Sequence, residues 1–246
     1  MKTIAIIPAR YASTRFPGKP LVDICGKPML QWVYERVSSV KNLSDVFVAI
    51  DDERIRTVCE EKGIKYIMTR NDHPDHIARI QEVSEKVQAD VYVCVNGDEP
   101  LISPECIEQV IPIELPEDFF FTGAMRLMDN AAETLDPARI KVVAAEDGRC
   151  IYMSRTPVPY PKGTLMFHYN KYVGIECFSK ESLDFFVSTP QAMLEKIEDI
   201  DHLRFLEHGK TLYFKYVDSE SISVDMPKDV EKVRVLMSKM LASQKQ

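Results

Sequence analysis

The sequence predicts an α/β fold in which a mostly parallel central sheet is flanked by helices. The first segment, KTIAIIPA (2–9), is a continuous apolar run that ends in a turn residue, as is typical of a strand buried on both faces. Apolar runs then alternate with segments of helical spacing, which is the pattern of βαβ units. After about residue 115 several strand-like segments follow one another, which indicates antiparallel strands and helices added to the same sheet.

The elements of the first half follow from this alternation. The helix expected over 28–41 has Pro28 at its start and apolar residues at helical spacing, and the helix over 52–62 ends at Gly63. A third helix is expected over 77–88. The later strands of this half are DVFVAID (45–51), KYIMT (65–69) and DVYVCV (90–95).

In the second half, strand-like segments follow one another instead of alternating with helices. Its expected strands lie in FFFTGAMRL (119–127), IKVVAAEDGRCIYMSR (140–155) and KYVGIECFS (171–179). The turn at Glu146-Asp147-Gly148 is hairpin-like, and the proline-rich segment 156–163 is expected to be a loop. Because no linker separates the two halves, we expect one domain over 1–246.

Composition excludes several classes of function. The net charge is −7, so no overall basic field would attract nucleic acid or an anionic membrane. The six cysteines form no C-x-x-C pair and are expected to be reduced core thiols. The apolar segment Ile4–Ala9 is too short for a signal peptide or a membrane span, and we therefore expect a cytoplasmic protein.

The loop after the first strand, ARYASTRFPGKP (9–20), has the composition of an anion site. Three cations, Arg10, Arg15 and Lys19, stand within ten residues, and Ser13 and Thr14 add hydroxyls. Ligands of open α/β sheets bind beyond the carboxyl ends of the strands, so a triphosphate is the expected partner. The spacing matches neither the Walker nor the Rossmann pattern. On charge alone, a solvated basic loop is an equal alternative.

The motif PARYASTRFPGKPL, with GKPM a few residues later, resembles the opening signature of the sugar-acid cytidylyltransferases, most closely those that act on 3-deoxy-manno-octulosonate (Kdo). The resemblance continues through nearly the whole chain, in MTRNDH, NGDEP, IKVV, YMSR, VGI, LEKIEDIDHLR and VDMPKDV. It implies a nucleotide-diphospho-sugar transferase-like fold. It also implies a nucleotide-binding part over about 1–115, a sugar-binding and dimerisation part over about 116–225, a C-terminal helix over 226–246, and a homodimer.

The activity implied by the resemblance is transfer of CMP from CTP to the anomeric hydroxyl of a small acidic sugar, for cell-surface polysaccharide synthesis. The CTP-binding residues implied are Pro8, Ala9, Arg10, Ser13, Arg15 and Lys19. Lys19, Arg10, Arg15 and Asp98 are the implied catalytic residues, and Asp98 and Asp225 are the implied ligands of Mg²⁺. Each aspartate follows a strand-like run. As alternatives, Asp98 would cap a turn and Asp225 the final helix. For Glu99 two roles stay open: ordering the turn or holding metal-bound water.

Sugar-binding residues are also implied. Arg70 and Arg155 are expected to pair with the sugar carboxylate, although either could be a surface ion-pair partner instead. The other implied sugar-binding residues are Asp72, His73, Asn96, Tyr172, Asp201 and His202. His73 and His76 have a spacing that would also suit zinc, but no third or fourth ligand is evident nearby in the sequence.

The chain departs from the family pattern in four segments on the sugar side. The pattern T-R-x-D-H-x-S-G-T-E-R appears as TRNDHPDHIAR, and H-L-G-I-Y-G-Y appears as YVGIECF. Q-G-D-E-P becomes NGDEP, and L-E-Q-L-R becomes IDHLR. Two explanations stay open: a different acid sugar, such as a Kdo analogue or a nonulosonic acid, and lineage drift with compensating contacts.

Two rival functions also remain at this stage. The first is a cytidylyltransferase that acts on an alcohol phosphate, against which the two arginines argue. The second is a nucleotide-binding or assembly protein without catalysis, against which the presence of both Asp98 and Asp225 argues.

Overall fold

A computed structural model of the chain describes residues 1–13, 15–128, 130–164, 166–219 and 221–243. Within these residues the strands are β1 (Thr3–Ala9), β2 (Asp23–Ile24), β3 (Lys27–Pro28), β4 (Asp45–Ile50), β5 (Tyr66–Met68), β6 (Val91–Val95), β7 (Phe121–Leu127), β8 (Lys141–Ala144), β9 (Cys150–Ser154), β10 (Asn170–Phe178) and β11 (Tyr213–Tyr216). The helices are α1 (Met29–Ser38), α2 (Glu53–Lys62), α3 (His76–Lys86), α4 (Pro104–Val110), α5 (Ala131–Leu135), α6 (Lys180–Ser188), α7 (Met193–Glu198), α8 (Leu203–Glu207) and α9 (Pro227–Ser243), with a short 3₁₀ turn, η1, at Lys19–Leu21.

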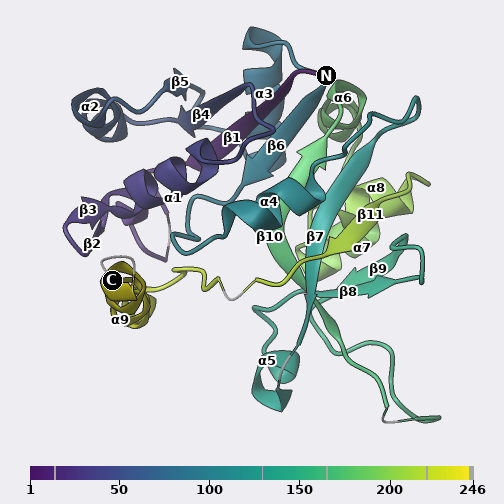
Figure 1. Cartoon of the computed structure of the whole chain (residues 1–246). Coiled ribbons are helices and arrows are strands. Elements are labelled where there is room, and N and C mark those ends of the chain that lie inside the picture. Colours follow the sequence, from purple (N-terminus) through teal and green to yellow (C-terminus); the bar gives the residue numbers. More distant parts are fainter. Residues whose placement is uncertain (14, 129, 165, 220, 244–246) are drawn as a thin grey trace.

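One central sheet, in the order β11-β7-β10-β6-β1-β4-β5, runs through both halves of the chain (Figure 1). Strands β5, β4, β1 and β6 pair in parallel, and β10 joins β6 antiparallel. Strand β7 pairs with the other edge of β10, and β8 pairs with β10 at Asn170 and Lys171, on the edge opposite β7. Strand β9 pairs with β8, and the small hairpin β2-β3 stands apart. The predicted α/β fold with added antiparallel strands is therefore confirmed.

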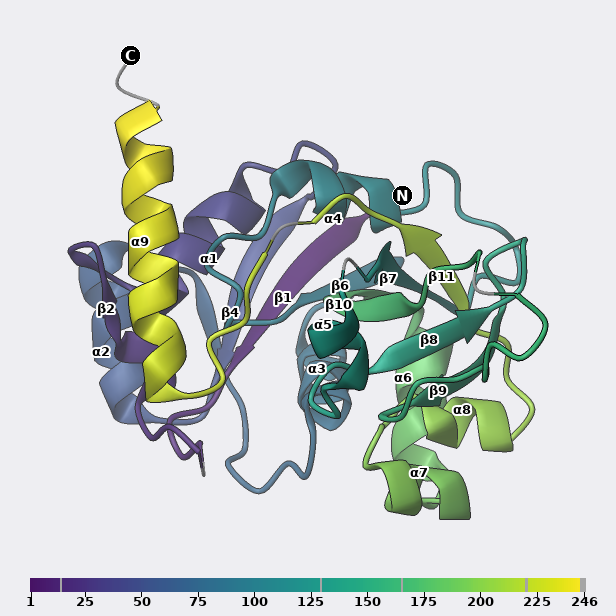
Figure 2. The same cartoon turned by 90° about the horizontal axis from the view of Figure 1, so that it is seen from below.

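Strand β1 is buried on both faces, as its apolar run predicts. Ala5 and Ile7 pack in a cluster with α1, α2 and α4, whereas Ile4 and Ile6 pack in a second cluster with α3 and α6. Figure 2 shows α1 and α4 on one side of the sheet and α3 and α6 on the other. This two-sided burial excludes water from the strands and fixes the loops that leave their carboxyl ends.

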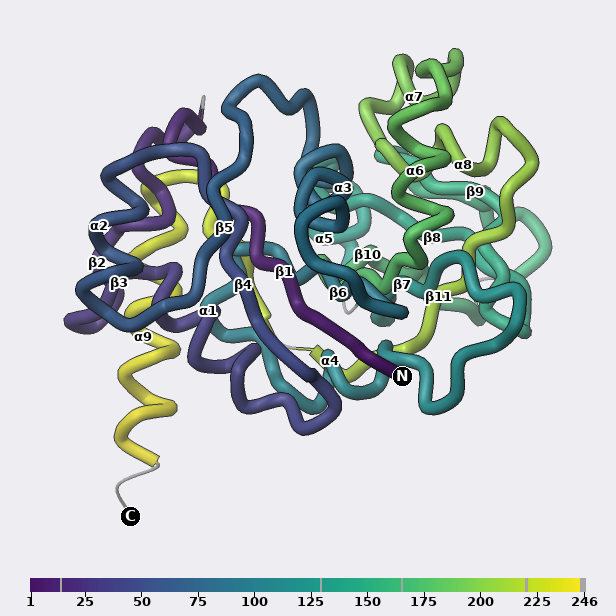
Figure 3. The backbone as a smooth tube through the Cα atoms, turned by 90° about the horizontal axis from the view of Figure 1, so that it is seen from above, coloured from purple at the N-terminus to yellow at the C-terminus, as the bar shows by residue number. Residues whose placement is uncertain are grey.

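The C-terminal helix α9 packs beside the first loop. Val230, Val233 and Met237 of α9 pack against Ile24, Met29 and Trp32, and α9 lies next to β2 and α1 in Figures 2 and 3. This packing brings the segment that precedes α9 to the first loop, which the sequence separation does not show. Among the described residues, no helix combines the length and the apolar character that crossing a bilayer requires.

Candidate active site

The first loop closes on itself directly after β1. The carbonyl oxygen of Tyr11 accepts hydrogen bonds from the amides of Ser13 and Gly18, both at 2.9 Å. Gly18 has a φ of +72°, a left-handed conformation that favours glycine, and it begins η1. The amide of Tyr11 donates to Oδ1 of Asp51 at 3.1 Å, which ties the loop to the end of β4. Thr14, which was expected to offer a hydroxyl, lies outside the described residues.

Asp98 meets the first loop at the carboxyl end of β6. A Cβ atom at Gly97 would lie 2.8 Å from the carbonyl oxygen of Pro8, so the absence of a side chain lets the two segments approach. Nζ of Lys19 donates to Oδ2 of Asp98 at 2.7 Å. A residue of the first loop and a residue 79 positions later therefore form one half-buried ion pair.

Asp225 also lies beside the first loop, but the segment that leads to it is not the strand that was expected. A strand was expected before it, but the described residues between β11 and α9 form none. Instead, the amide of Val224 donates to the carbonyl oxygen of Asp98 at 2.9 Å. Arg15 then pairs with Asp225, Nη2 to Oδ1 at 3.1 Å. Oδ2 of Asp229 accepts from the amides of Asp225 and Met226, just before α9, whereas the Asp225 carboxylate accepts from the hydroxyl of Ser223 and pairs with Arg15. No described contact therefore supports the alternative that Asp225 caps this helix.

The two aspartates suit a divalent cation. Their side chains are 22% and 30% exposed, and the Val224 hydrogen bond holds their segments side by side. Mg²⁺ is bound through one or two carboxylates together with water and substrate phosphates, so this donor set fits it.

A cavity of about 420 Å³ joins this charged end to the sugar-side segments. It is lined by most of the predicted residues: Pro8, Ala9, Arg10, Ser13, Arg15, Lys19, Asn96, Asp98, Tyr172, Asp201 and His202. The lining also includes residues to which no role was given, among them Asp75, His76, Arg79, Asp199 and Ile200. Nucleotide-side and sugar-side residues thus face one space.

Four predicted sugar-binding residues lie outside this lining. Arg70 is exposed, with its Nε 3.4 Å from Oδ1 of Asp72. His73 is buried, with its Nε2 2.5 Å from Oε2 of Glu82. The structure does not bring these three residues to the cavity, and their sugar contacts stay predictions.

Arg155, the fourth, binds backbone instead of facing the cavity. Its guanidinium donates to the carbonyl oxygens of Glu198, Asp199 and Pro137 at 2.5, 2.7 and 3.2 Å. It thereby fixes the segment that carries Asp199 into the lining. Pairing of Arg155 with a sugar carboxylate stays a prediction.

A buried carboxylate, Glu176, organises the sugar side. It is 0% exposed, and its oxygens lie 3.0 Å from Nε2 of His76, 2.5 Å from Nε2 of His202 and 2.6 Å from the hydroxyl of Tyr172. Burial alone would raise the pKa of Glu176, but the imidazoles of His202 and His76 outweigh it and hold this pKa well below its usual range. Glu176 is therefore ionised.

His76 connects this buried acid to the cavity. Its Nδ1 lies 3.5 Å from Oδ2 of Asp201. Burial would lower the pKa of His76, but Glu176 and Asp201 raise it well above its usual value. Since His73 pairs with Glu82 and His76 with Glu176, the two imidazoles of the zinc alternative have separate carboxylate partners. Cys94 also lies beside His76 and Glu176, and burial raises the pKa of its thiol.

Sequence reasoning noted Glu176 only as a departure from a pattern, and His76 as a departure and as half of the zinc alternative. Residues 76 and 176 are 100 positions apart, so nothing local indicates that they touch. The one signal for this contact in the sequence was that an acid and two histidines are among the residues that differ from the family pattern. Arg79, which donates to Asp51 at 2.8 Å and to Thr69 at 2.6 Å, gave no such signal.

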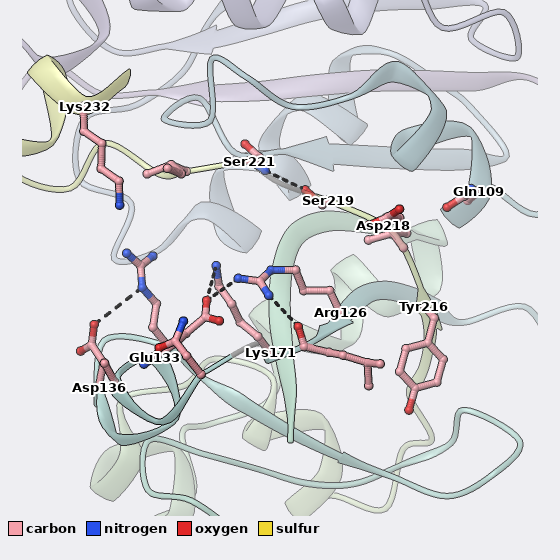
Figure 4. Close-up of a pocket in the computed structure, with 16 residues that line it drawn as sticks. Gln109, Arg126, Glu133, Asp136, Lys171, Tyr216, Asp218, Ser219, Ser221 and Lys232 are labelled. Carbon is pink, nitrogen blue, oxygen red and sulfur yellow. Dashed lines mark hydrogen bonds and ion pairs between the residues drawn. The ribbon is translucent and has the colours of Figure 1, made fainter. Parts of the chain in front are cut away.

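A second, larger cavity of about 1190 Å³ lies between α5, β10 and the segment before α9 (Figure 4). Arg126, Glu133 and Lys171 meet there, and Nζ of Lys171 lies 3.6 Å from Oε1 of Glu133. None of the predicted site residues lines this cavity within the described chain. The predicted cations of the first loop line the smaller cavity, which is therefore the candidate site.

The chain is similar in sequence and in structure to known cytidylyltransferases. The cytidylyltransferase family profile matches residues 4–212. The 3-deoxy-manno-octulosonate cytidylyltransferase of Escherichia coli is 39% identical over 241 residues, which are 98% of each chain. An 8-amino-3,8-dideoxy-manno-octulosonate cytidylyltransferase of Shewanella sp. (strain W3-18-1) is 38% identical over 94% of this chain and 97% of its own. A solved structure of CMP:2-keto-3-deoxy-manno-octonic acid synthetase complexed with CTP superposes with a TM-score of 0.91 at 38% identity, covering 98% of this chain and all of that one.

Proposed function

Because the chain belongs to the cytidylyltransferase family, we propose that it transfers CMP from CTP to the anomeric hydroxyl of a 3-deoxy-2-ulosonic acid and releases pyrophosphate. Kdo and its 8-amino-3,8-dideoxy analogue are the two candidate sugars, since the relatives are named for them. The observation that carries the proposal is the meeting of two first-loop cations with two distant aspartates, Lys19 with Asp98 and Arg15 with Asp225.

The nucleotide end of the cavity would hold CTP. The backbone of Pro8 and Ala9 lies at the carboxyl end of β1, where a base can be read by main-chain groups. Arg10, Arg15 and Lys19 stabilise the negative charge that grows on the departing pyrophosphate. Ser13 offers a further hydroxyl on the same rim.

Mg²⁺ is the proposed metal, and Asp98 and Asp225 are the residues that would hold it. Bound there, it would neutralise phosphate charge and lower the pKa of the attacking hydroxyl. Without a bound ligand each of these carboxylates is neutralised by a loop cation. Arg15 lies in the first loop and Lys19 begins η1, and both have long side chains that could turn towards phosphate oxygens when the nucleotide enters.

The sugar end of the cavity would orient the acid sugar. Tyr172, Asp201 and His202 line this end, and Asn96 stands between it and the turn that carries Asp98. These side chains present fixed hydrogen-bonding groups, which discriminate between sugars because a wrong substrate leaves buried polar groups unpaired. A homodimer in the cytoplasm, serving cell-surface polysaccharide synthesis, remains part of this proposal.

Pyrophosphate release tests the proposal. The purified chain is assayed with CTP and Mg²⁺ against Kdo, its 8-amino analogue, nonulosonic acids and an alcohol phosphate such as inositol 1-phosphate. Release with an acid sugar and none with the alcohol phosphate is expected. Binding of CTP without pyrophosphate release on any acid sugar would contradict it and favour a protein without catalysis.

A further inference from the structure

Residues at which the chain departs from the family pattern form one contact cluster. Glycine in the pattern is replaced by His76, tyrosine by Glu176 and glutamine by His202. In the structure the carboxylate of Glu176 lies 3.0 Å from the His76 imidazole and 2.5 Å from that of His202. Tyr172, which replaces the histidine of the pattern, donates its hydroxyl to the same carboxylate at 2.6 Å.

The energetics of burial link these replacements. Glu176 is fully buried, and a buried carboxylate without partners costs several kcal/mol. Glu176 alone, placed against the glycine and glutamine of the pattern, would have no cation beside it. Independent drift at each position would therefore pass through unstable intermediates, whereas replacement as a unit keeps the buried charge paired at every contact.

The cluster ends at a carboxylate that faces the sugar. Nδ1 of His76 lies 3.5 Å from Oδ2 of Asp201, whose side chain is 29% exposed and lines the cavity. Burial would raise the pKa of Asp201, but the hydrogen bond and charge of His76 lower it, so Asp201 is ionised. An ionised carboxylate only accepts hydrogen bonds, and it pairs best with a cation.

Charge at this end of the cavity favours a cationic group on the sugar. Asp75, Asp199 and Asp201 all line the cavity, and Asp199 lies 3.6 Å from Nη2 of Arg155. Two cationic side chains of the lining are engaged with other carboxylates: Arg79 with Asp51, and His76 with Glu176 as well as Asp201. The charges of His76 and His202 act on the partly exposed Asp201, but no arginine or lysine of the described lining forms an ion pair with it.

We propose that Asp201 binds an amino group of the sugar acid, and that His76 and Glu176 are positioning residues that hold Asp201 in place. The proposal rests on the proposed function and deepens it, because it selects a sugar with an ammonium over one with hydroxyls alone. Because the pattern already has a glutamate at position 201, the specificity-determining feature is the shorter carboxylate of Asp201 held in place by His76. His76 acts on the sugar only through Asp201, and Glu176 only through His76.

Paired kinetics on the full chain test this. The wild-type kcat/KM for 8-amino-3,8-dideoxy-Kdo is expected to exceed that for Kdo by about tenfold or more, as one charged hydrogen bond provides. Asp201→Asn should bring the ratio close to one, because it should raise the KM for the amino sugar much more than the KM for Kdo. His76→Gln and Glu176→Gln should each lower the ratio part of the way.

The controls separate a positioning role from a structural one. Asp201→Glu should restore part of the preference, and Glu181→Gln, at an exposed position of α6, should leave it unchanged. If Glu176→Gln fails to fold, the partly exposed Asp201→Asn still decides the question. A wild-type enzyme without preference, or a preference that survives Asp201→Asn, overturns the inference while leaving the proposed function intact. Absence of pyrophosphate release with every acid sugar would instead remove the proposed function.

Discussion

The nucleotide end and the sugar end of the cavity use charge in opposite ways. At the nucleotide end, Arg15 and Lys19 pair with aspartates through side chains that solvent or a ligand can reach, and Arg15 is 61% exposed. At the sugar end, Glu176 is completely buried and both of its oxygens are engaged. Exposed pairs exchange partners easily, whereas buried pairs fix geometry. The first end is therefore suited to transient phosphate chemistry and the second to selecting a shape.

The largest expected effect comes from the cation that links the first loop to Asp98. Lys19→Ala should lower kcat about 10²–10³-fold, because it removes a donor from the charge that develops on pyrophosphate. Its melting temperature should change little, since the pair is only half-buried. Lys27→Ala is the matched control, because Lys27 pairs with Glu35 outside the cavity lining. Unchanged turnover in folded Lys19→Ala would refute the role of Lys19.

A second prediction concerns the metal. Asp225→Asn should raise the Mg²⁺ concentration for half-maximal rate at least about tenfold, since even outer partners of a metal site contribute 10–100-fold. Titration of Mg²⁺ at saturating CTP measures it. Asp118→Asn, an exposed acid outside the cavity lining, serves as the control. An unaltered Mg²⁺ requirement would show that Asp225 is only an ion-pair partner of Arg15.

A third prediction concerns the pH dependence of folding stability that the sugar end of the cavity should cause. The folded-state pKa of His76 lies above its ordinary value of 6.5, so its stabilisation is fully present below about pH 6.5 and is lost as pH rises through the folded value. Glu176, with a lowered pKa, contributes above its ordinary value of 4.5 and loses this as pH falls. Other groups facing His76 are Asp75, Asp201, His202 and Cys94.

Urea unfolding at pH 6.5 and pH 9 measures this contribution. The wild type should lose on the order of 1 kcal/mol more than His76→Gln between the two values. Lys19→Ala, at the other end of the cavity, should keep the wild-type dependence. Equal losses in wild type and His76→Gln would mean that His76 is not charged in the folded protein.

The smallest effect is expected at Arg15. Its pair with Asp225 is exposed, so Arg15→Ala should change the free energy of unfolding by less than about 1 kcal/mol. The KM for CTP should rise by a few-fold, and less at high salt, because exposed charges are screened. A stability loss several times larger would show that the nucleotide end is also structural, which would erase the contrast between the two ends.

Much of the fold could be predicted because its signals are local. The run KTIAIIPA and the Gly63 stop depend on neighbours in the chain, and β1 and α2 lie where these signals place them. The strand expected before Asp225 failed for the opposite reason. Packing of α9 on Trp32 and a hydrogen bond to Asp98 decide the course of that segment.

The candidate site divides in the same way. The cations of the first loop stand within ten residues, so the sequence alone determined that this loop is a candidate anion site. Only the tertiary structure brought Asp225 to Arg15, left Arg70 and Arg155 out of the cavity lining, and joined His76, Glu176 and His202 in one buried network. The physical reason is the distance along the chain over which each kind of interaction acts. Backbone propensity and hydrophobic period act over a few residues, whereas pairing of a buried charge depends on which segments the folded sheet and helices bring together.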